Sequence, residues 1–315
     1  MPQTLDIQTK NFLEGMAQNP GPRLYELPVE GAREFLKGAS KIFELPPCEV
    51  GSSEDRSITY EGGAYTVRLY SPPDSDNDMV PAIILYHGGG FMLGDLDTHD
   101  TIARYLCRHT GSKVVSVDYR LAPEFGFPAG LEDCYHALLW LSDNAADLGV
   151  DPEKISLVGD SAGGNLSAGV AQLVIRRGGP HIASIVLLYP SCDMRLETDY
   201  PSRELYGNGD YFLGLKDIEW IADHYLKDED PAKNSLFSPI LNNDFTGWPP
   251  TLVITAGMDI LRDEGRAYYD FLVQNSVKAH YQSYDGTIHG FVSFAGALDL
   301  GKKCLADVAE YFKGQ

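Results

Sequence analysis

Continuous apolar segments alternate with amphipathic segments along the chain from about residue 80 to the C-terminus. A strand that is covered by helices on both faces is apolar throughout, so these segments predict a mostly parallel sheet between two layers of helices. Strands are expected at residues 82–87, 113–120, 154–160, 183–190, 251–259 and 279–285. Helices are expected near residues 98–109, 128–144, 164–176, 264–275 and 300–313. In such α/β sheets, binding sites form at the carboxyl ends of the strands.

Three segments depart from this pattern. Apolar and polar residues alternate in RSITYEGG and AYTVRLYSP, on either side of Gly62 and Gly63, which predicts a half-exposed antiparallel hairpin. Residues 1–50 contain a helix-like stretch, and residues 195–245 interrupt the strand and helix series just after a strand ends. We interpret these last two segments as the two parts of a helical cap over the site, and residues 51–194 and 246–315 as the catalytic domain.

The amino-acid composition of the chain limits the classes of function that it can have. The chain has 315 residues, of which 43% are hydrophobic, enough to bury a large core. Its 45 acidic and 25 basic residues give a formal net charge of −20, so nucleic acid is not an expected partner.

The cysteines and the N-terminus narrow the possibilities further. The five cysteines are scattered and contain no C-x-x-C pair, so neither a disulfide framework nor a zinc site is expected. The N-terminal residues lack a basic region followed by an apolar one, and no apolar run approaches the roughly 20 residues that span a bilayer. We therefore expect a cytoplasmic protein without membrane insertion.

The sequence Gly159-Asp160-Ser161-Ala162-Gly163 stands between a predicted strand and a predicted helix. It matches G-x-S-x-G, the turn that exposes a nucleophilic serine, and the strand before it and helix after it are the context that this motif requires. The alternative is a glycine-rich helix start without chemistry. A serine nucleophile further requires a base, an acid that orients the base, and donors for an oxyanion.

The base and the acid are expected downstream of the serine. Of the histidines that follow it, His289 alone lies in a loop between the last strand and the final helix, flanked by glycine. His181, His224 and His280 fall before the best acid or inside a strand pattern. Asp259 ends a buried strand at its carboxyl end, and we assign it the role of orienting His289.

Asp263 and Glu264 are alternative candidates for the carboxylate that orients His289. They stand where a helix begins, and the helix dipole explains acidic residues there.

An oxyanion site is predicted upstream, at His87-Gly88-Gly89-Gly90 after a strand. The glycines allow the main chain to curl so that its N–H groups point toward a reacting carbonyl. A phosphate cradle is the alternative, but no Lys-Ser/Thr follows the glycines. The backbone N–H of Ala162 is the expected further donor. His87 is interpreted as a structural residue of this loop.

Several of these motifs occur together in an order that resembles the hormone-sensitive-lipase-like family of serine esterases, the bacterial family IV carboxylesterases. The shared motifs, from about residue 80 onward, are HGGG, VVSVDYRLAPE, GDSAGG, GMDILRDEG and HGF. The resemblance implies an α/β-hydrolase fold with a helical cap, a cofactor-free hydrolase of short- to medium-chain acyl esters, and an oxyanion hole formed by Gly89, Gly90 and Ala162. The sequence departs from the family at Ile260, where a proline often follows the acid, and at Met258, where a small residue is common.

The cap should supply part of the substrate wall. Candidates are Gly88, Phe91, Tyr206, Tyr211, Phe212, Leu213 and Phe291, with ordinary core packing as the alternative for each aromatic. An amidase or deacetylase is the neighbouring alternative, because the same three residues can serve both bonds. A small-ligand receptor is another, since gibberellin receptors resemble members of this family that have lost the catalytic histidine, whereas His289 is retained here. The expected state is a monomer or homodimer.

Overall fold

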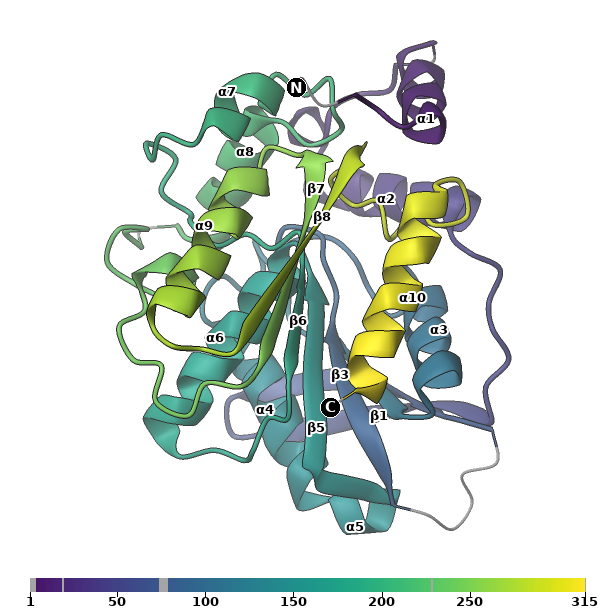
Figure 1. The fold of residues 1–315 in the computed structure, drawn as a ribbon, viewed down its shortest axis with the longest axis vertical. Helices are drawn as coiled ribbons and strands as arrows, with labels where there is room; N and C mark the ends of the chain where they lie inside the picture. The colour runs from purple at the N-terminus through teal and green to yellow at the C-terminus, as the bar shows by residue number, and fades with distance from the viewer. Residues whose placement is uncertain (1–3, 19, 74–78, 228, 315) are drawn as a thin grey trace.

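An eight-stranded sheet runs through the molecule with helices on both faces in a computed structural model that describes residues 4–18, 20–73, 79–227 and 229–314 (Figure 1). The strands lie in the order β1-β2-β4-β3-β5-β6-β7-β8. Their bounds are β1 Ser52–Tyr60, β2 Gly63–Ser71, β3 Val80–Tyr86, β4 Lys113–Asp118, β5 Val150–Asp160, β6 Ile185–Leu188, β7 Thr251–Met258 and β8 Ala279–Ile288. Neighbouring strands from β4 to β8 are parallel. The predicted fold class is confirmed.

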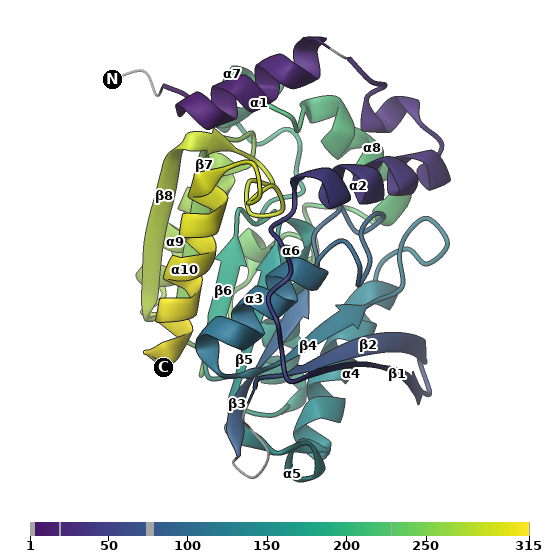
Figure 2. The same ribbon diagram turned by 90° about the vertical axis from the view of Figure 1, so that its right-hand side faces the viewer.

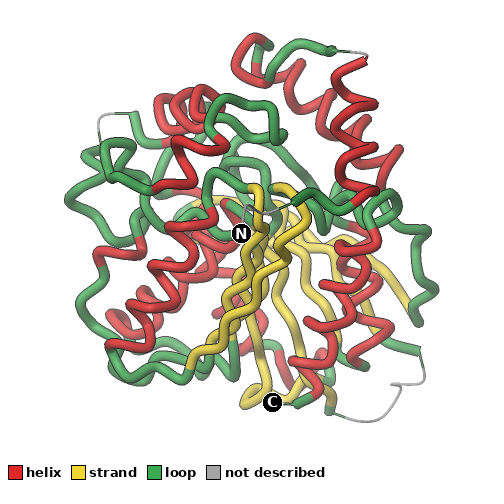
Figure 3. Tube along the Cα trace, turned by 45° about the horizontal axis from the view of Figure 1, so that its top comes forward, coloured by secondary structure: helices red, strands yellow, loops and turns green. Residues whose placement is uncertain are grey.

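The central strands are apolar on both faces because both faces are covered. On β3, Ile84 and Tyr86 pack into one core, whereas Ile83 and Leu85 pack into the other. The helices α4 (Ala129–Asp143), α6 (Ala162–Arg177) and α9 (Arg262–Gln274) contribute to the first core, and α3 (Asp100–Thr110) and α10 (Asp299–Lys313) to the second. Figure 3 shows the strands in yellow between these two sets of red helices. A short helix, α5 (Ala145–Leu148), precedes β5.

The predicted hairpin forms at the edge of the sheet. β1 and β2 pair in antiparallel register, with Tyr60 opposite Gly63, and β2 continues the sheet by pairing antiparallel with β4. Most residues of β1 are exposed because β1 is an outermost strand, whereas β2 alternates between buried and partly exposed residues.

The two segments interpreted as a cap lie together above the carboxyl ends of the parallel strands (Figures 1 and 2). The first contains α1 (Ile7–Gln18), the 3-10 turn η1 (Leu24–Glu26) and α2 (Val29–Phe43). The second contains α7 (Pro201–Tyr206), α8 (Leu215–Tyr225) and the 3-10 turn η2 (Pro239–Leu241). The domain boundaries stay a prediction. Within the described ranges, no helix combines the length and apolar character needed to span a bilayer.

The strand register brings the ends of distant strands together. Tyr86 at the end of β3 pairs with Gly159 on β5, so the loop that begins at His87 lies beside the turn at Ser161. On the other side, Met258 of β7 pairs with Ile288 of β8, so the residues that follow these two strands are also neighbours.

The last strand is longer than the sequence predicts. β8 continues through Ile288 and not only to residue 285, so His289 follows the strand directly. The extension passes a register shift between Ala256 and Met258 of β7. At Gly257, inside this irregularity, a Cβ atom would collide with the backbone of Asp285, so the close approach requires glycine.

Candidate active site

Ser161 occupies a sharp corner between β5 and α6. Its φ is +54° and its ψ is −115°, a backbone conformation that few non-glycine residues adopt and that costs on the order of 1–3 kcal/mol. The backbone N–H of Ser161 donates to the carbonyl of Leu188 on β6 at 2.8 Å, which ties the corner to the neighbouring strand. The hydroxyl is thereby held at the edge of the cavity.

The two glycines of the motif are required by close backbone contacts. A Cβ atom at Gly159 would collide with the carbonyl of Gly163, and a Cβ at Gly163 would collide with the carbonyl of Tyr86 on β3. Helix α6 therefore begins at Ala162, two residues before the predicted start, and packs directly against the strand ends.

His289 bridges Ser161 and Asp259. Its Nε2 atom lies 2.9 Å from Ser161 Oγ, and its Nδ1 atom lies 2.8 Å from Asp259 Oδ2. A carboxylate can only accept, so Nδ1 carries the proton and donates it to Asp259, which leaves Nε2 free to accept from the serine hydroxyl. Asp259 and His289 are only 1% and 6% exposed, so little water competes for these bonds.

The loop after Asp259 is fixed without a proline at position 260. The other carboxylate oxygen of Asp259 accepts from the backbone N–H of Leu261 at 2.9 Å. The Ile260 side chain is buried in a small apolar cluster with Leu213 and Ile218 of the cap.

The rival acids have other partners. Asp263 accepts from the backbone N–H of Ser202 at 2.8 Å. Glu264 is fully buried, pairs with Arg203 of α7 at 2.8 Å, and accepts from the backbone N–H of Cys192. Burial raises the pKa of Glu264 to about 7, although Arg203 opposes the rise.

Gly89 and Gly90 carry backbone N–H groups on the wall of the cavity beside Ala162, the first residue of α6. Both glycines have positive φ, +117° and +61°. A Cβ at Gly89 would collide with the carbonyl of Leu93, and one at Gly90 would meet Ile221 of α8. No acceptor for the N–H of Gly89, Gly90 or Ala162 is found among the residues that the structure describes. These groups are therefore available to an incoming oxyanion, helped by the α6 dipole.

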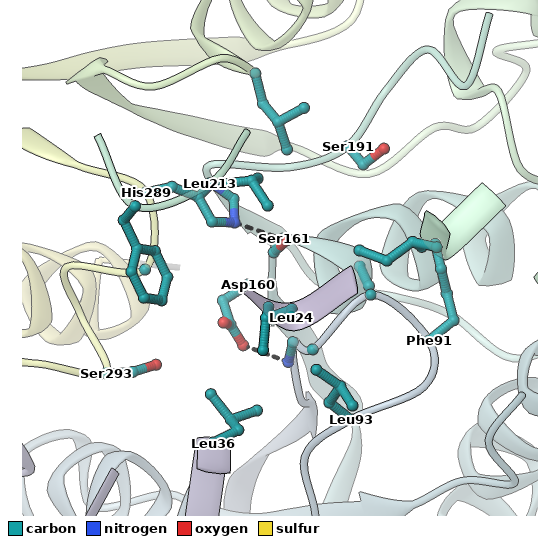
Figure 4. Close-up of a pocket in the computed structure, with 18 of the residues that line it drawn as sticks. Leu24, Leu36, Phe91, Leu93, Asp160, Ser161, Ser191, Leu213, His289 and Ser293 are labelled. Carbon is teal, nitrogen blue, oxygen red and sulfur yellow. Dashed lines mark hydrogen bonds between the residues drawn. The ribbon is translucent and has the colours of Figure 1, made fainter. Parts of the chain in front are cut away.

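Gly88 is held in place by Asp160, a residue that the sequence analysis did not single out and that Figure 4 labels beside Ser161. Its N–H donates to Asp160 Oδ1 at 2.7 Å, and the same oxygen lies 3.0 Å from Nε2 of His99. Burial alone would raise the pKa of Asp160, but His99 and the Gly88 N–H outweigh it, so the pKa lies below its usual value. A carboxylate directly before the nucleophile, after the mostly apolar residues 155–159 of β5, was the available signal.

His87 is placed as a structural residue. Its ring stacks on Tyr119 with centroids 4.3 Å apart, and Tyr119 donates to the His87 carbonyl at 2.8 Å. Burial lowers the pKa of His87 to about 4, so the ring is neutral at neutral pH. Its Nδ1 atom lies 2.9 Å from the Gly88 carbonyl, whereas the partner of Ser161 Oγ is His289.

An apolar cavity lies over Ser161 and is closed by both parts of the cap. The N-terminal part contributes Leu24, Leu36 and Ser40, and the second part contributes Ile218 and Ile221. Sequence reasoning did not find these residues, because nothing local to a cap helix tells which of its side chains face the site. Figure 4 shows Leu36 and Leu93 on one side of Ser161 and His289 on another.

Four of the residues predicted for the substrate wall line this cavity: Gly88, Phe91, Phe212 and Leu213. The other three do not. Phe291 is fully buried behind the site against Tyr189 and Tyr284, with ring centroids 5.4 and 5.2 Å away. Tyr206 packs edge-on against Tyr211 at 5.0 Å, outside the cavity wall. The prediction was wrong for these three rings, because they pack against neighbouring aromatic side chains and do not line the cavity.

The arrangement suits attack on a carbonyl carbon. A hydroxyl, an imidazole positioned to take its proton, and a carboxylate lie in one chain of hydrogen bonds, beside backbone donors. In the part of the chain that the structure describes, no group of three or more His, Cys, Asp or Glu side chains is arranged to hold a metal ion, and all five cysteines are free.

Comparison with known proteins agrees with the fold and the motifs. The family model described as alpha/beta hydrolase fold matches residues 83–293. The carboxylic ester hydrolase LipN of Mycobacterium tuberculosis is 42% identical over 84% of this chain and 70% of that protein. The arylesterase of Saccharolobus solfataricus is 36% identical over 82% of this chain and 85% of that protein.

Solved structures are similar over nearly the whole chain. The hyperthermophilic esterase from the archaeon Pyrobaculum calidifontis has a TM-score of 0.92 and 38% identity, covering 99% of this chain and 98% of that one. An ester hydrolase from the metagenome of Lake Arreo has a TM-score of 0.93 and 36% identity, covering 99% of both chains. The chain belongs to the alpha/beta hydrolase fold family, in its hormone-sensitive-lipase-like group of carboxylesterases. The resemblance stated from the motifs is thus confirmed.

Proposed function

We propose that this carboxylesterase hydrolyses short- to medium-chain acyl esters through an acyl-enzyme, with Ser161 as nucleophile, His289 as general base and acid, and Asp259 as the residue that orients His289. The observation that carries the proposal is the unbroken pair of hydrogen bonds from Asp259 through His289 to Ser161, 2.8 and 2.9 Å long. Asp259 also stabilises the imidazolium that forms when His289 accepts the proton.

In the first half of the reaction, Ser161 Oγ attacks the ester carbonyl as His289 Nε2 takes its proton. The oxyanion that forms accepts hydrogen bonds from the N–H groups of Gly89, Gly90 and Ala162. His289 then gives the proton to the leaving alkoxide, which departs as the alcohol. Water attacks the acyl-enzyme by the same route and releases the acid.

The apolar lining of the cavity supports the substrate class. Its wall is mainly aliphatic and aromatic, and the cap closes it over Ser161, so a modest apolar acyl group fits better than a polar or polymeric one.

The test is turnover of p-nitrophenyl esters from acetate to palmitate by the parent protein and by Ser161→Ala. We expect hydrolysis of the shorter esters and a loss of about 10⁴-fold or more in the variant. A matched control is Ser191→Ala, because Ser191 also lines the cavity but makes no hydrogen bond to His289 among those described. Equal turnover by Ser161→Ala and the parent would refute the nucleophile.

Anilides and N-acetyl compounds, added to this panel of esters, separate the alternatives. An amidase or deacetylase would prefer anilides or N-acetyl compounds to esters of the same acyl group. A receptor would bind small apolar ligands without turnover, but the hydrogen-bonded His289 favours catalysis. The cytoplasmic location and the monomeric or dimeric state stay predictions.

A further inference from the structure

Phe212 stands where three cavities meet. It lines the catalytic cavity, a second cavity beside residues 20–24, and a third, almost wholly apolar one between α1 and α2. The second and third cavities also share Met16, Phe35 and Ala39, so the two cavities adjoin each other and together form a groove along α2. We call this the α1/α2 groove. Leu24, Leu36 and Phe212 line both the catalytic cavity and the second cavity, so they stand between the two.

The wall between the groove and the catalytic cavity is aromatic. Phe212 meets Phe294 edge-on with ring centroids 5.2 Å apart, and Phe294 contacts Phe12 of α1 at 5.1 Å. Both Phe212 and Phe294 line the third cavity as well as the catalytic one. Each ring can turn by rotation about two side-chain bonds, so a change of rotamer at Phe212 would open a path between the catalytic cavity and the groove.

The backbone at Phe212 is strained. Its φ is +80°, and the N–H of Leu213 donates to the carbonyl of Tyr211 at 3.2 Å, which closes a tight turn centred on Phe212. Such a turn is rare for a residue with a side chain, and strain of this kind gathers at ligand-binding positions. Here it aims the phenyl ring at the loop after His289: a Cβ at Gly290 would lie 3.5 Å from both Phe212 and Phe294.

The position of His289 determines which half of an ester faces this wall. His289 Nε2 must reach the leaving oxygen in order to protonate it. The alkyl group on that oxygen therefore extends past the residues that follow His289, which are Gly290, Ser293 and Phe294 in the cavity wall. The acyl group lies toward the opposite wall, where Ile221 packs over Gly90.

We infer that the α1/α2 groove is a subsite for the linear alkyl chain of the leaving alcohol, and that Phe212 is the specificity-determining residue at its entrance. The inference rests on the proposed function and adds the alcohol half of the substrate to it. The end of the groove between α1 and α2 suits an alkyl chain because Phe12, Met16, Ala39 and Phe43 line it, and Phe35 is 40% exposed at its rim. The end beside residues 20–24 also carries Arg23, Asp210 and Asp217. An exposed apolar surface that continues from a catalytic cavity gains stabilisation when a chain covers it.

The test is kcat/KM for ethyl, butyl, hexyl and octyl acetate, measured by acid release, with p-nitrophenyl acetate, hexanoate and octanoate as the acyl series. Ala39→Trp fills the groove at a position away from the reacting atoms, and Lys41→Trp, on an exposed part of α2 that lines none of the three cavities, is the matched control. Each buried methylene is worth about fourfold in binding. We therefore expect Ala39→Trp to lower kcat/KM for octyl acetate about 10- to 50-fold, and for ethyl acetate less than about twofold.

Two further variants complete the test. Phe212→Ala should raise the ratio of octyl to ethyl acetate turnover about fivefold or more, because it opens the entrance. Phe35→Ser, at the exposed rim, should lower that ratio even if Ala39→Trp fails to fold. The subsite would be refuted if the variants kept the parent's dependence of kcat/KM on the length of the alkyl chain. It would also be refuted if kcat/KM fell only for the p-nitrophenyl esters of the acyl series. Failure of the parent to hydrolyse even p-nitrophenyl and ethyl acetate would instead refute the proposed function.

Discussion

The Nε2 atom of His289 lies 2.9 Å from the Oγ atom of Ser161, although 128 residues separate them in the chain. The sheet produces this proximity. β5 ends at Asp160 and β8 ends at Ile288, and parallel pairing through β6 and β7 brings both ends to the same edge. A side chain that follows either strand therefore reaches the same cavity.

The hydrogen bond between His289 and Asp259 predicts a large effect of Asp259→Asn. An amide in place of the carboxylate can donate to Nδ1, which favours the tautomer with the proton on Nε2, so Nε2 can no longer accept from Ser161. We expect kcat/KM for p-nitrophenyl butyrate to fall about 10³- to 10⁴-fold. Asp263→Asn is the control, since Asp263 bonds to Ser202 and Arg262 instead, and it should cost less than about tenfold. If Asp263→Asn lost more activity than Asp259→Asn, Asp263 would be the residue that orients His289.

The contact between Asp160 and the Gly88 N–H predicts that Asp160 positions the oxyanion loop. Asp160→Ala removes the acceptor and should lower kcat about 10²-fold with little change in KM, because Gly89 and Gly90 then lose their fixed orientation. Asp160→Asn retains an acceptor oxygen and should restore much of the rate. Initial rates at several substrate concentrations separate kcat from KM. If KM rises while kcat stays constant, or if Asp160→Asn is as slow as Asp160→Ala, the positioning role fails.

The buried carboxyl group of Glu264 should make the free energy of unfolding depend on pH. Burial raises its pKa to about 7 in the folded protein, above the unfolded value near 4.5, so the folded state holds this proton more tightly. The resulting stabilisation is complete below about pH 4.5 and is lost as the pH rises through about 7. Between about pH 5 and pH 8, the free energy of unfolding of the parent should fall by about 2–3 kcal/mol more than that of Glu264→Gln.

Urea denaturation at the two pH values measures this difference. Glu204→Gln on α7 is the control, because Glu204 is exposed beside Arg203 and has no comparable burial. Parallel pH profiles for the parent and Glu264→Gln would mean that Arg203 compensates the buried carboxylate fully.

The close approach of Gly163 to β3 predicts that Gly163→Ala prevents folding or lowers the free energy of unfolding by about 3 kcal/mol or more, since the added Cβ would collide with the Tyr86 backbone. Gly15→Ala, in the interior of α1 with no atom within 4 Å of the added Cβ, should be neutral or stabilising by up to about 1 kcal/mol. Thermal unfolding of both variants measures the contrast. A Gly163→Ala protein as stable as the parent would contradict the packing described for the nucleophile turn.

The strands and the motif residues were accessible from sequence because the constraints on them are local. A strand buried on both faces must be apolar at successive positions, so residues such as Ile83 and Ile84 reveal β3 directly. The turn at Ser161 needs glycine at fixed offsets on either side of the serine, which is why five letters were enough to find it.

The wall of the cavity was not accessible in the same way. Tyr206, Tyr211 and Phe212 are close in sequence, yet only Phe212 lines the catalytic cavity, because α7 ends at Tyr206 and the irregular turn that follows has no period that assigns side chains to a face. Leu24 and Leu36 reach the cavity from the other end of the chain, and no local pattern relates them to Ser161.

Local backbone chemistry thus specified the sheet, the nucleophile turn, and the order in which serine, acid and histidine occur. The pairing register of β3 to β8, the support of Gly88 by Asp160, and the aromatic wall around Phe212 arose when distant segments packed together. Contacts of this second kind depend on side-chain direction and on which segments become neighbours, and a linear pattern of residues encodes neither explicitly.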